Sequence, residues 1–195
     1  MSFSDQFFNE VVEVANGINK NKVEEIVTKL VYTRDFSEGR VFVLGVGGSA
    51  GNASHMVNDL RKLCGIEAYC PTDNASEITA RTNDEGFDTI FVEYLKVSRL
   101  SHLDTIFILS VGGGDEERNV SVGLIKAIKL AKDVDATVVG IVGKGDGYTA
   151  INGDAVVVVP AIEPTRITPH SEAFQAVVWH CVVSHPKLQI NKTKW

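Results

Sequence analysis

The sequence predicts an α/β fold in which helices cover both faces of a parallel sheet. Five apolar segments of strand length alternate with segments of helical periodicity over most of the 195 residues. Strands that are apolar throughout are typical of parallel sheets, because helices bury both of their faces. Two amphipathic segments precede the first strand. We therefore expect a three-layer αβα sandwich with a parallel sheet, preceded by two N-terminal helices.

The two N-terminal helices are expected over residues 4–18 and 21–33. Apolar side chains recur there at the three- and four-residue spacing of a helix face. They are Phe7, Phe8, Val11, Val12 and Ala15 in the first helix, and Val23, Ile26, Val27, Leu30 and Val31 in the second. These apolar stripes need a partner, which is either the body of the domain or a second subunit.

The alternating part of the chain begins at Arg40 and continues to the last helix. The expected strands are residues 40–46, 66–70, 104–111, 136–143 and 154–160. The expected helices run from the first strand to about Leu63 and then over residues 76–84, 87–99, 120–132 and 170–184, and the segment KGDG after the fourth strand is expected to be a turn. We interpret residues 1–195 as one domain, with helices for packing or oligomerisation in 1–35, an α/β core in 36–186 and a loosely held polar tail in 187–195.

Composition excludes several classes of function. The net charge is −6, and no basic run is longer than a pair, so a nucleic-acid partner is not expected. No apolar run is long enough to cross a membrane, and the N-terminal segment lacks the basic and apolar regions of a signal peptide. The three cysteines are odd in number and have no C-x-x-C spacing. A cytoplasmic, reduced protein is the simplest interpretation.

Glycine and serine follow two of the expected strands, in the segments GVGGSAGNAS (45–54) and SVGGGDEERNVS (110–121). In a parallel sheet both segments lie at the carboxyl edge, where helix N-termini bind anions. The candidate ligands are the hydroxyls of Ser49, Ser54, Ser110 and Ser121 and the backbone of Gly47, Gly48, Gly112 and Gly113. The alternative is that the glycines only make turns. The first loop lacks the full dinucleotide-binding pattern, and no G-K-[ST] motif is present.

Histidine and carboxylate side chains form the second group of candidates. His55 and Asp59 are four residues apart, so they share a helix face and can converge on a metal ion or act as an acid–base pair. The alternative is a surface hydrogen bond between them. His180 lies in the apolar helical segment AVVWHCVV, where a histidine is either a core residue or a catalytic group. Glu172 lies on the same expected helix. His102 and His185 are interpreted as surface residues.

With these loops and side chains in place, the chain resembles the sugar isomerase (SIS) domain family and, within it, the phosphoheptose isomerases. The resemblance covers nearly the whole chain. Its most specific parts are Gly47–Ser49, the pair His55 and Asp59, the segment Asn83–Gly86, and the last helix with Glu172 and His180. It implies conversion of sedoheptulose 7-phosphate to D-glycero-D-manno-heptose 7-phosphate, an early step toward heptose in bacterial lipopolysaccharide or capsule. It also implies a homotetramer with active sites at subunit boundaries and one Zn2+ per subunit.

The resemblance also implies roles for single residues. Ser49 is similar to a phosphate or sugar ligand, His55 to a zinc ligand, and Asp59 to a glutamate that is both catalytic base and metal ligand. Glu172 falls where the family has a glutamine metal ligand, and His180 on the catalytic histidine, which completes a zinc set of His55, Asp59, Glu172 and His180. Asp84, with Asn83, matches an acid near the sugar.

The second loop departs from the family pattern S-T-S-G-N-S. Here it reads Ser110-Val-Gly-Gly-Gly with several additional residues, so two hydroxyl donors are missing. Backbone N–H groups of residues 112–114, Arg118 or Ser121 could bind the phosphate in their place. The glutamate at position 172 also makes a zinc set of two histidines and two carboxylates neutral overall.

Helix geometry limits how the four expected zinc ligands can meet. Eight residues of helix rise about 12 Å, whereas two ligands of one zinc ion lie at most about 4 Å apart. Glu172 and His180 therefore cannot reach one ion from a single straight helix. Either Glu172 precedes the helix and folds back, or the site combines residues of two subunits.

Three other functions remain open at this point. The first is a non-catalytic tetrameric SIS module that binds a sugar phosphate or a replication-initiator protein. The second is a sugar-phosphate sensor, which is disfavoured because no basic helix-turn-helix is present. The third is an etherase that acts on an N-acetylmuramic acid phosphate, which the short chain disfavours. The presence of His55, Asp59 and His180 together favours the isomerase.

Overall fold

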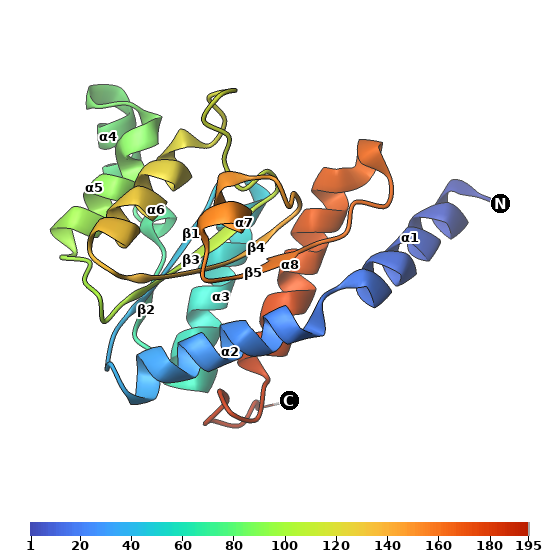
Figure 1. Ribbon diagram of the computed structural model, residues 1–195, viewed down its shortest axis with the longest axis horizontal. Helices are drawn as coiled ribbons and strands as arrows, with labels where there is room; N and C mark the ends of the chain where they lie inside the picture. Colours follow the sequence, from blue (N-terminus) through green and yellow to red (C-terminus); the bar gives the residue numbers. More distant parts are fainter. Residues whose placement is uncertain (195) are drawn as a thin grey trace.

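The computed structural model describes residues 1–194 and confirms the α/β fold with a parallel sheet (Figure 1). The sheet has five strands in the order β2-β1-β3-β4-β5, and all neighbouring strands are parallel. The strands are β1 (Val41–Gly45), β2 (Ala68–Tyr69), β3 (Thr105–Ser110), β4 (Thr137–Val142) and β5 (Ala155–Val158).

Residues 1–194 form eight α-helices. They are α1 (Phe3–Gly17), α2 (Lys20–Asp35), α3 (Gly48–Cys64), α4 (Ala75–Asp84), α5 (Ile90–Val97), α6 (Val122–Asp133), α7 (Tyr148–Asn152) and α8 (Ile167–Val183). None of these helices is both long and apolar enough to cross a membrane.

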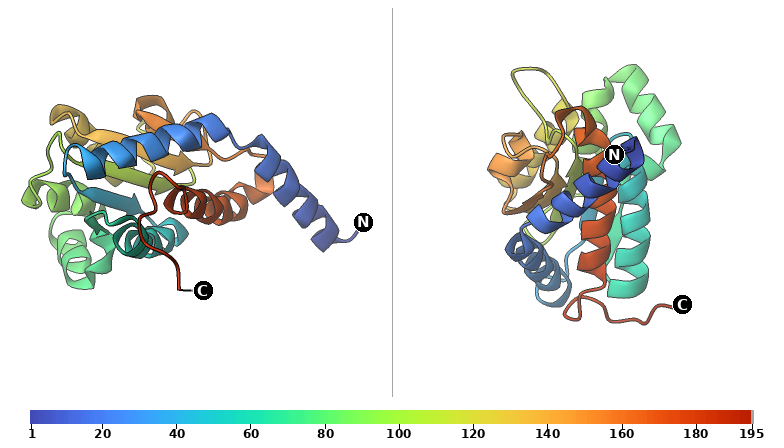
Figure 2. Two further views of the ribbon diagram at one scale, coloured as in Figure 1. Left: turned by 90° about the horizontal axis from the view of Figure 1, so that it is seen from below. Right: turned by 90° about the vertical axis from the view of Figure 1, so that its right-hand side faces the viewer.

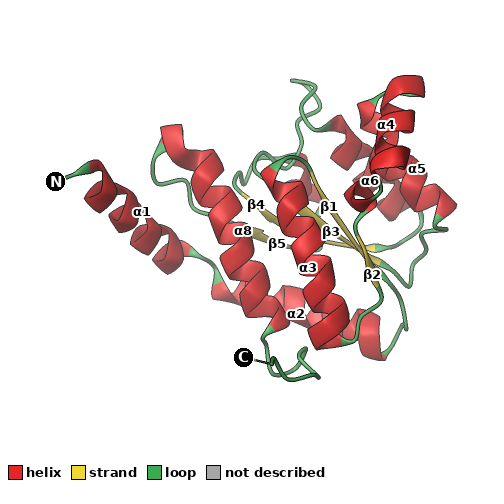
Figure 3. Cartoon of the chain, turned by 180° about the vertical axis from the view of Figure 1, so that it is seen from behind, coloured by secondary structure: helices red, strands yellow, loops and turns green. Residues whose placement is uncertain are grey.

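The two faces of the sheet support two separate apolar clusters. Because side chains alternate along a strand, Val41 and Val43 point to one face, and Phe42 and Leu44 to the other. The first face packs against α2, α3 and α8, and α3 and α8 lie in front of the sheet in Figure 3. The second face packs against α5 and α6. This arrangement is the three-layer sandwich that the sequence predicts.

The strand order creates a switch point between β1 and β3. From β1 the chain moves outward to β2, whereas from β3 it moves in the other direction to β4 and β5. The helices that follow β1 and β3 therefore lie on opposite faces, and a crevice opens between the carboxyl ends of the two strands. Ligands of open parallel sheets bind at such a point.

Helix α1 extends away from the body of the molecule, as Figure 1 and the left view of Figure 2 show. A buried ion-pair cluster holds it against the beginning of α8. Glu10 of α1 accepts two hydrogen bonds from the Arg166 guanidinium at 2.6 and 2.8 Å, and His170 Nε2 lies 2.8 Å from the same carboxylate. The hydrogen bonds from Arg166 and then His170 lower the pKa of Glu10 to about 2. The cluster is therefore anionic at Glu10 under ordinary conditions and orients α1.

The structure differs from the sequence prediction at three elements. The segment expected to be a helix over 87–99 is a short 3₁₀ turn (Phe87–Thr89) followed by α5. The short helix α7 follows the KGDG turn and was not expected. Helix α8 begins at Ile167 rather than near His170, and it includes Pro169. Proline is tolerated in a first helical turn because its missing N–H would have no partner there.

The expectation that the C-terminal tail is loosely held is wrong for residues 185–191. Leu188 is fully buried, and the backbone N–H groups of Ile190 and Asn191 both donate to the Leu63 carbonyl at the end of α3. The Arg34 guanidinium donates to the carbonyls of Leu188, Lys187 and Cys64. The tail therefore closes the carbonyl end of α3 and joins it to α2.

We expect the Arg34→Ala variant to lose about 2–3 kcal/mol of unfolding free energy, because it leaves partly buried carbonyls without a charged donor. Urea unfolding followed by circular dichroism would measure the loss. Arg118→Ala is the matched control, since that side chain is 75% exposed and its ion pair with Asp115 spans 3.6 Å. A change within about 0.5 kcal/mol is expected for the control. Equal stability of the two variants would contradict the role of Arg34.

Candidate active site

Three of the residues predicted from sequence come together on the surface formed by α3 and α8. His55 and Asp59 lie on α3, and His180 lies near the end of α8. One possible ligand atom from each of the three lies within 4.8 Å of the others. His55 is 57% exposed and Asp59 15% exposed as side chains, and His180 is also exposed. The sequence left open whether His180 is a core residue, and the structure places it at the surface.

A backbone contact fixes the tautomer of His180. Its Nδ1 atom lies 2.8 Å from the Ala176 carbonyl oxygen, one helical turn earlier. A carbonyl only accepts hydrogen bonds, so Nδ1 carries the proton and donates it. In the neutral ring Nε2 is then unprotonated and presents its lone pair outward. His180 can therefore bind a metal ion or accept a proton only through Nε2.

The chemistry of this donor set fits a zinc ion. Two imidazoles and one carboxylate are typical catalytic zinc ligands, and they leave a fourth position for water, substrate or another side chain. Ligands of one zinc ion lie at most about 4 Å apart, so the observed spacing needs only small side-chain rotations. The exposed rings of His55 and His180 have room for such rotations. These three residues would hold the ion.

Glu172 does not join this cluster within one chain. It lies inside α8, so the expectation that it could precede the helix and fold back is wrong. Its carboxylate lies directly over Gly48 at the N-terminus of α3, and a Cβ atom at position 48 would lie 2.4 Å from the nearer carboxylate oxygen. Glycine is therefore required at position 48 for this contact, and Glu172 points to the positive end of the α3 dipole.

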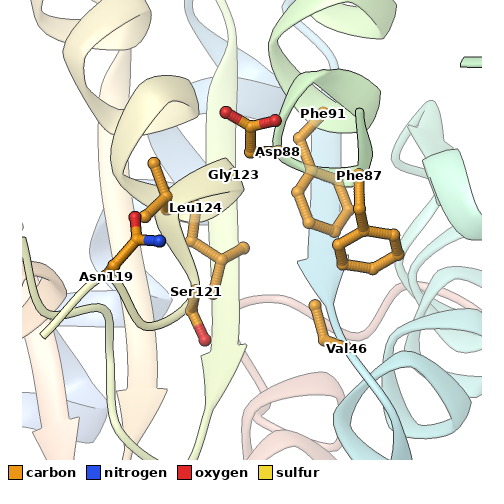
Figure 4. A pocket seen from close by; sticks show the side chains of 9 residues that line it. Val46, Phe87, Asp88, Phe91, Asn119, Ser121, Gly123 and Leu124 are labelled. Carbon is orange, nitrogen blue, oxygen red and sulfur yellow. The ribbon is translucent and has the colours of Figure 1, made fainter. Parts of the chain in front are cut away.

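A cleft of about 490 Å³ opens at the switch point between β1 and β3 (Figure 4). It is lined by Val46 after β1, by Phe87, Asp88 and Phe91 near α5, and by Asn119, Ser121, Val122, Gly123 and Leu124 at the start of α6. Ser121 precedes α6 in a left-handed conformation, with a φ of 52°, and its side chain makes no capping hydrogen bond. The Leu124 N–H donates to the Ser121 carbonyl at 3.0 Å, whereas the N–H groups of Val122 and Gly123 have no backbone partner among residues 1–194 and are available to an anion.

The remaining predicted ligands are dispersed around the carboxyl edge of the sheet. Ser49 is buried at the start of α3, after Gly47, whose φ of 64° requires glycine. Ser110 accepts a hydrogen bond from the Gly113 N–H at 3.0 Å, and the Gly113 carbonyl accepts from Thr149. These contacts hold the glycines of the second loop against α7, and Gly112 is half-buried beside them.

Asn83 and Asp84 lie exposed at the end of α4 and bond to each other at 2.7 Å. The cleft residues Phe87, Asp88 and Phe91 follow them closely in sequence, and none of the three was singled out as a site residue. Their position just after the segment Asn83–Gly86 was the signal that could have found them. Asn119 was not predicted, because the second loop is long and its sequence does not indicate which of its residues reaches the cleft.

Comparison with protein families gives a match to a model described as SIS domain, over residues 6–143. Among curated proteins, the lincomycin biosynthesis protein LmbN of Streptomyces lincolnensis is 34% identical over 81% of this chain, and the matched part spans 60% of that protein. A phosphoheptose isomerase of Mycobacterium tuberculosis is 34% identical over 75% of this chain and 71% of its own length.

Solved structures show the same fold at lower identity. A phosphoheptose isomerase from Francisella tularensis superposes with a TM-score of 0.78 at 21% identity and covers 94% of this chain and 97% of its own. A phosphoheptose isomerase from Neisseria gonorrhoeae has a TM-score of 0.68 at 23% identity, with 92% and 95% covered. At this level of identity, the likeness concerns the arrangement of helices and strands.

Proposed function

Because the chain belongs to the SIS domain family, we propose that it is an aldose–ketose isomerase that acts on a phosphorylated seven-carbon sugar. The reaction is the conversion of sedoheptulose 7-phosphate to D-glycero-D-manno-heptose 7-phosphate. The observation that carries the proposal is the cluster of His55, Asp59 and His180, which brings two proton-transfer groups and a metal-ligand set together on one surface. Relatives that bear the name phosphoheptose isomerase support the choice of substrate.

Isomerisation moves one proton between C1 and C2 and another between their oxygens, through an enediol. Asp59 and His180 share these transfers in our proposal. Because Nδ1 of His180 donates to Ala176, His180 moves a proton only at Nε2. Asp59 has two carboxylate oxygens, and Oδ1 already accepts from Asn58 at 2.9 Å. Its Oδ2 is the oxygen that faces His55 at 3.9 Å.

Zinc, when bound, would supply a Lewis acid that polarises the sugar oxygens. His55, Asp59 and His180 would hold it, with Glu172 of a partner subunit in the fourth position. The Nε2 atom that would bind the ion is the same atom that His180 uses for a proton. When an ion occupies that atom, His180 would serve as a ligand, and Asp59 would transfer the proton at carbon.

The phosphate of the substrate would bind at the start of α6, in the cleft of Figure 4. Free N–H groups, the helix dipole, Ser121 and Asn119 supply the donors there. The cleft is lined by α5 and α6, whereas the histidine cluster lies on α3 and α8, which cover the opposite face of the sheet. A substrate that spans both sites is accommodated more readily if the two sites come from different subunits.

We propose a homotetramer with active sites at subunit boundaries, in the cytoplasm, serving heptose synthesis for lipopolysaccharide or capsule. Exposed apolar side chains support the assembly. Phe8 and Val12 on α1 are 66% and 58% exposed, and Val177 on α8 is 56% exposed. Contiguous exposed apolar side chains on helices are typical of subunit interfaces.

The direct test is incubation of the purified protein with sedoheptulose 7-phosphate, in metal-stripped and zinc-restored samples. Appearance of an aldoheptose 7-phosphate only with zinc is the expected result. Unphosphorylated sedoheptulose is the matched control and should turn over far more slowly, because the phosphate supplies binding energy for the reaction. Product in both samples would support the isomerase activity and contradict its dependence on zinc. No product from a folded, assembled protein would favour the non-catalytic binding module instead.

A further inference from the structure

We propose that Trp179 is a positioning residue that holds the imidazoles of His55 and His180 in a geometry suited to bind one metal ion. The inference rests on the proposed function only in its use of this histidine cluster as a metal site. Trp179 was not among the residues singled out from sequence. It lies on α8, next to His180 in the chain.

The indole contacts both imidazoles, which come from two different helices. Its ring centroid lies 3.6 Å from that of His180, with the planes 27° apart, so the two rings are stacked. The His55 ring meets it edge to face at a centroid distance of 4.7 Å. The two imidazole centroids are 5.4 Å apart. Among residues 1–194, Trp179 therefore contacts both histidines and limits how far the two rings move relative to each other.

His55 depends on this contact more than His180 does. His180 is held at Nδ1 by the Ala176 carbonyl, whereas no hydrogen bond restrains the His55 ring within residues 1–194. Asp59, at 3.9 Å, is beyond hydrogen-bond distance. An exposed side chain on a helix populates several rotamers, and ordering it costs binding free energy. The edge-to-face contact with a buried, immobile indole removes part of that cost before a metal ion arrives.

Packing alone does not account for tryptophan at this position. The side chain is 0% exposed, and its Nε1 atom has no hydrogen-bond partner among residues 1–194. A buried donor without a partner destabilises the folded state. Phenylalanine or leucine would fill the core without that donor. The indole contacts both imidazoles. Phenylalanine would reproduce these ring contacts only in part, and leucine would not reproduce them.

The test measures metal affinity directly, in the assembled protein, by competition of Zn2+ with a chromogenic chelator. Trp179→Leu should bind Zn2+ at least about tenfold more weakly, which is typical for loss of a group that orients metal ligands. Trp179→Phe keeps an aromatic face and should restore most of the affinity. Phe107→Leu is the matched control. Phe107 lies on β3, is fully buried in the same apolar cluster, and makes no ring contact with a histidine among residues 1–194.

A spectroscopic signal tests the contact itself. The chain has two tryptophans, so in a Trp195→Phe background the emission comes from Trp179 alone. Co2+ bound by His55 and His180 should quench that emission at short range, and Zn2+, whose d shell is filled, should displace it and restore the signal. His180→Gln in the same background should remove the quenching.

The outcomes separate the inference from the proposed function. Zn2+ binding by Trp179→Leu equal to that of Phe107→Leu would overturn the positioning role while leaving the metal site and the isomerase intact. Absence of Zn2+ binding by the wild-type protein would overturn both the metal site and the role of Trp179. Weaker binding by Trp179→Leu, rescue by Trp179→Phe and Co2+ quenching in the Trp195→Phe protein together would support the inference.

Discussion

The His180→Gln variant is expected to turn over its substrate at least about a hundredfold more slowly than the wild-type protein, because it loses the Nε2 atom that would bind zinc in the loaded site or transfer a proton in its absence. The structure gives the reason at atomic level. The Ala176 carbonyl occupies Nδ1, so all chemistry of this residue passes through Nε2. A glutamine amide has no basic nitrogen with which to replace it. Stability should be nearly unchanged, because His180 is exposed.

The measurement is steady-state turnover of sedoheptulose 7-phosphate, with unfolding followed in parallel. Asp59→Asn should show a loss of similar size, because the amide cannot take the proton from carbon. His102→Gln is the control, since His102 is also exposed and lies far along the chain, just before β3. Near-normal turnover in both His180→Gln and Asp59→Asn would refute the assignment of the cluster as the catalytic site.

The fold was predictable because its strands carry an unmistakable pattern. β3 and β4 are apolar at nearly every position, which requires helices on both faces, and that observation alone indicates a parallel sheet. The order of the strands was not predictable from periodicity. Only the structure shows that strands are added to one side of β1 first and then to the other side, from β3 onward. This change in strand order creates the cleft between β1 and β3.

The tail shows a limit of composition. Residues 185–191 are polar, and polarity suggested weak attachment. Backbone hydrogen bonds to the end of α3 hold these residues, together with hydrogen bonds from Arg34. Arg34 is more than 150 positions away in sequence from each tail carbonyl that it binds. A single buried side chain, Leu188, marks the segment. Contacts between such distant segments have no periodic signature in the sequence.

The candidate site was predictable where its residues are close in sequence or lie on one helix. His55 and Asp59 share a face because of their four-residue spacing, and the structure shows them so. That His180 joins them depends on how α8 packs against α3, which spacing does not reveal. Trp179 was not predictable, because an apolar residue in an apolar helical segment has no sequence feature that marks it as part of a site. Its ring contacts with His55 and His180 are the feature that identifies it.

Mixed oligomers of two inactive variants are expected to recover turnover if a partner chain supplies Glu172 to the metal site. Along α8, Glu172 and His180 are separated by a rise of about 12 Å, and within one chain Glu172 lies over Gly48 instead. If the fourth ligand comes from a partner, a chain with Asp59→Asn can still provide Glu172. A chain with Glu172→Ala can likewise still provide His55, Asp59 and His180.

Each variant alone should be nearly inactive, whereas co-expression of the two should restore turnover. With equal amounts of both chains and random pairing across a two-fold axis, roughly one quarter of the sites combine intact groups. Turnover of about that fraction of wild type is the expected result. His55→Ala mixed with Asp59→Asn is the control, because those residues act from the same chain and no mixed pair rebuilds a site. Activity no higher than in the control would contradict a site shared between two subunits. Full turnover by Glu172→Ala alone would instead place Glu172 outside the metal site.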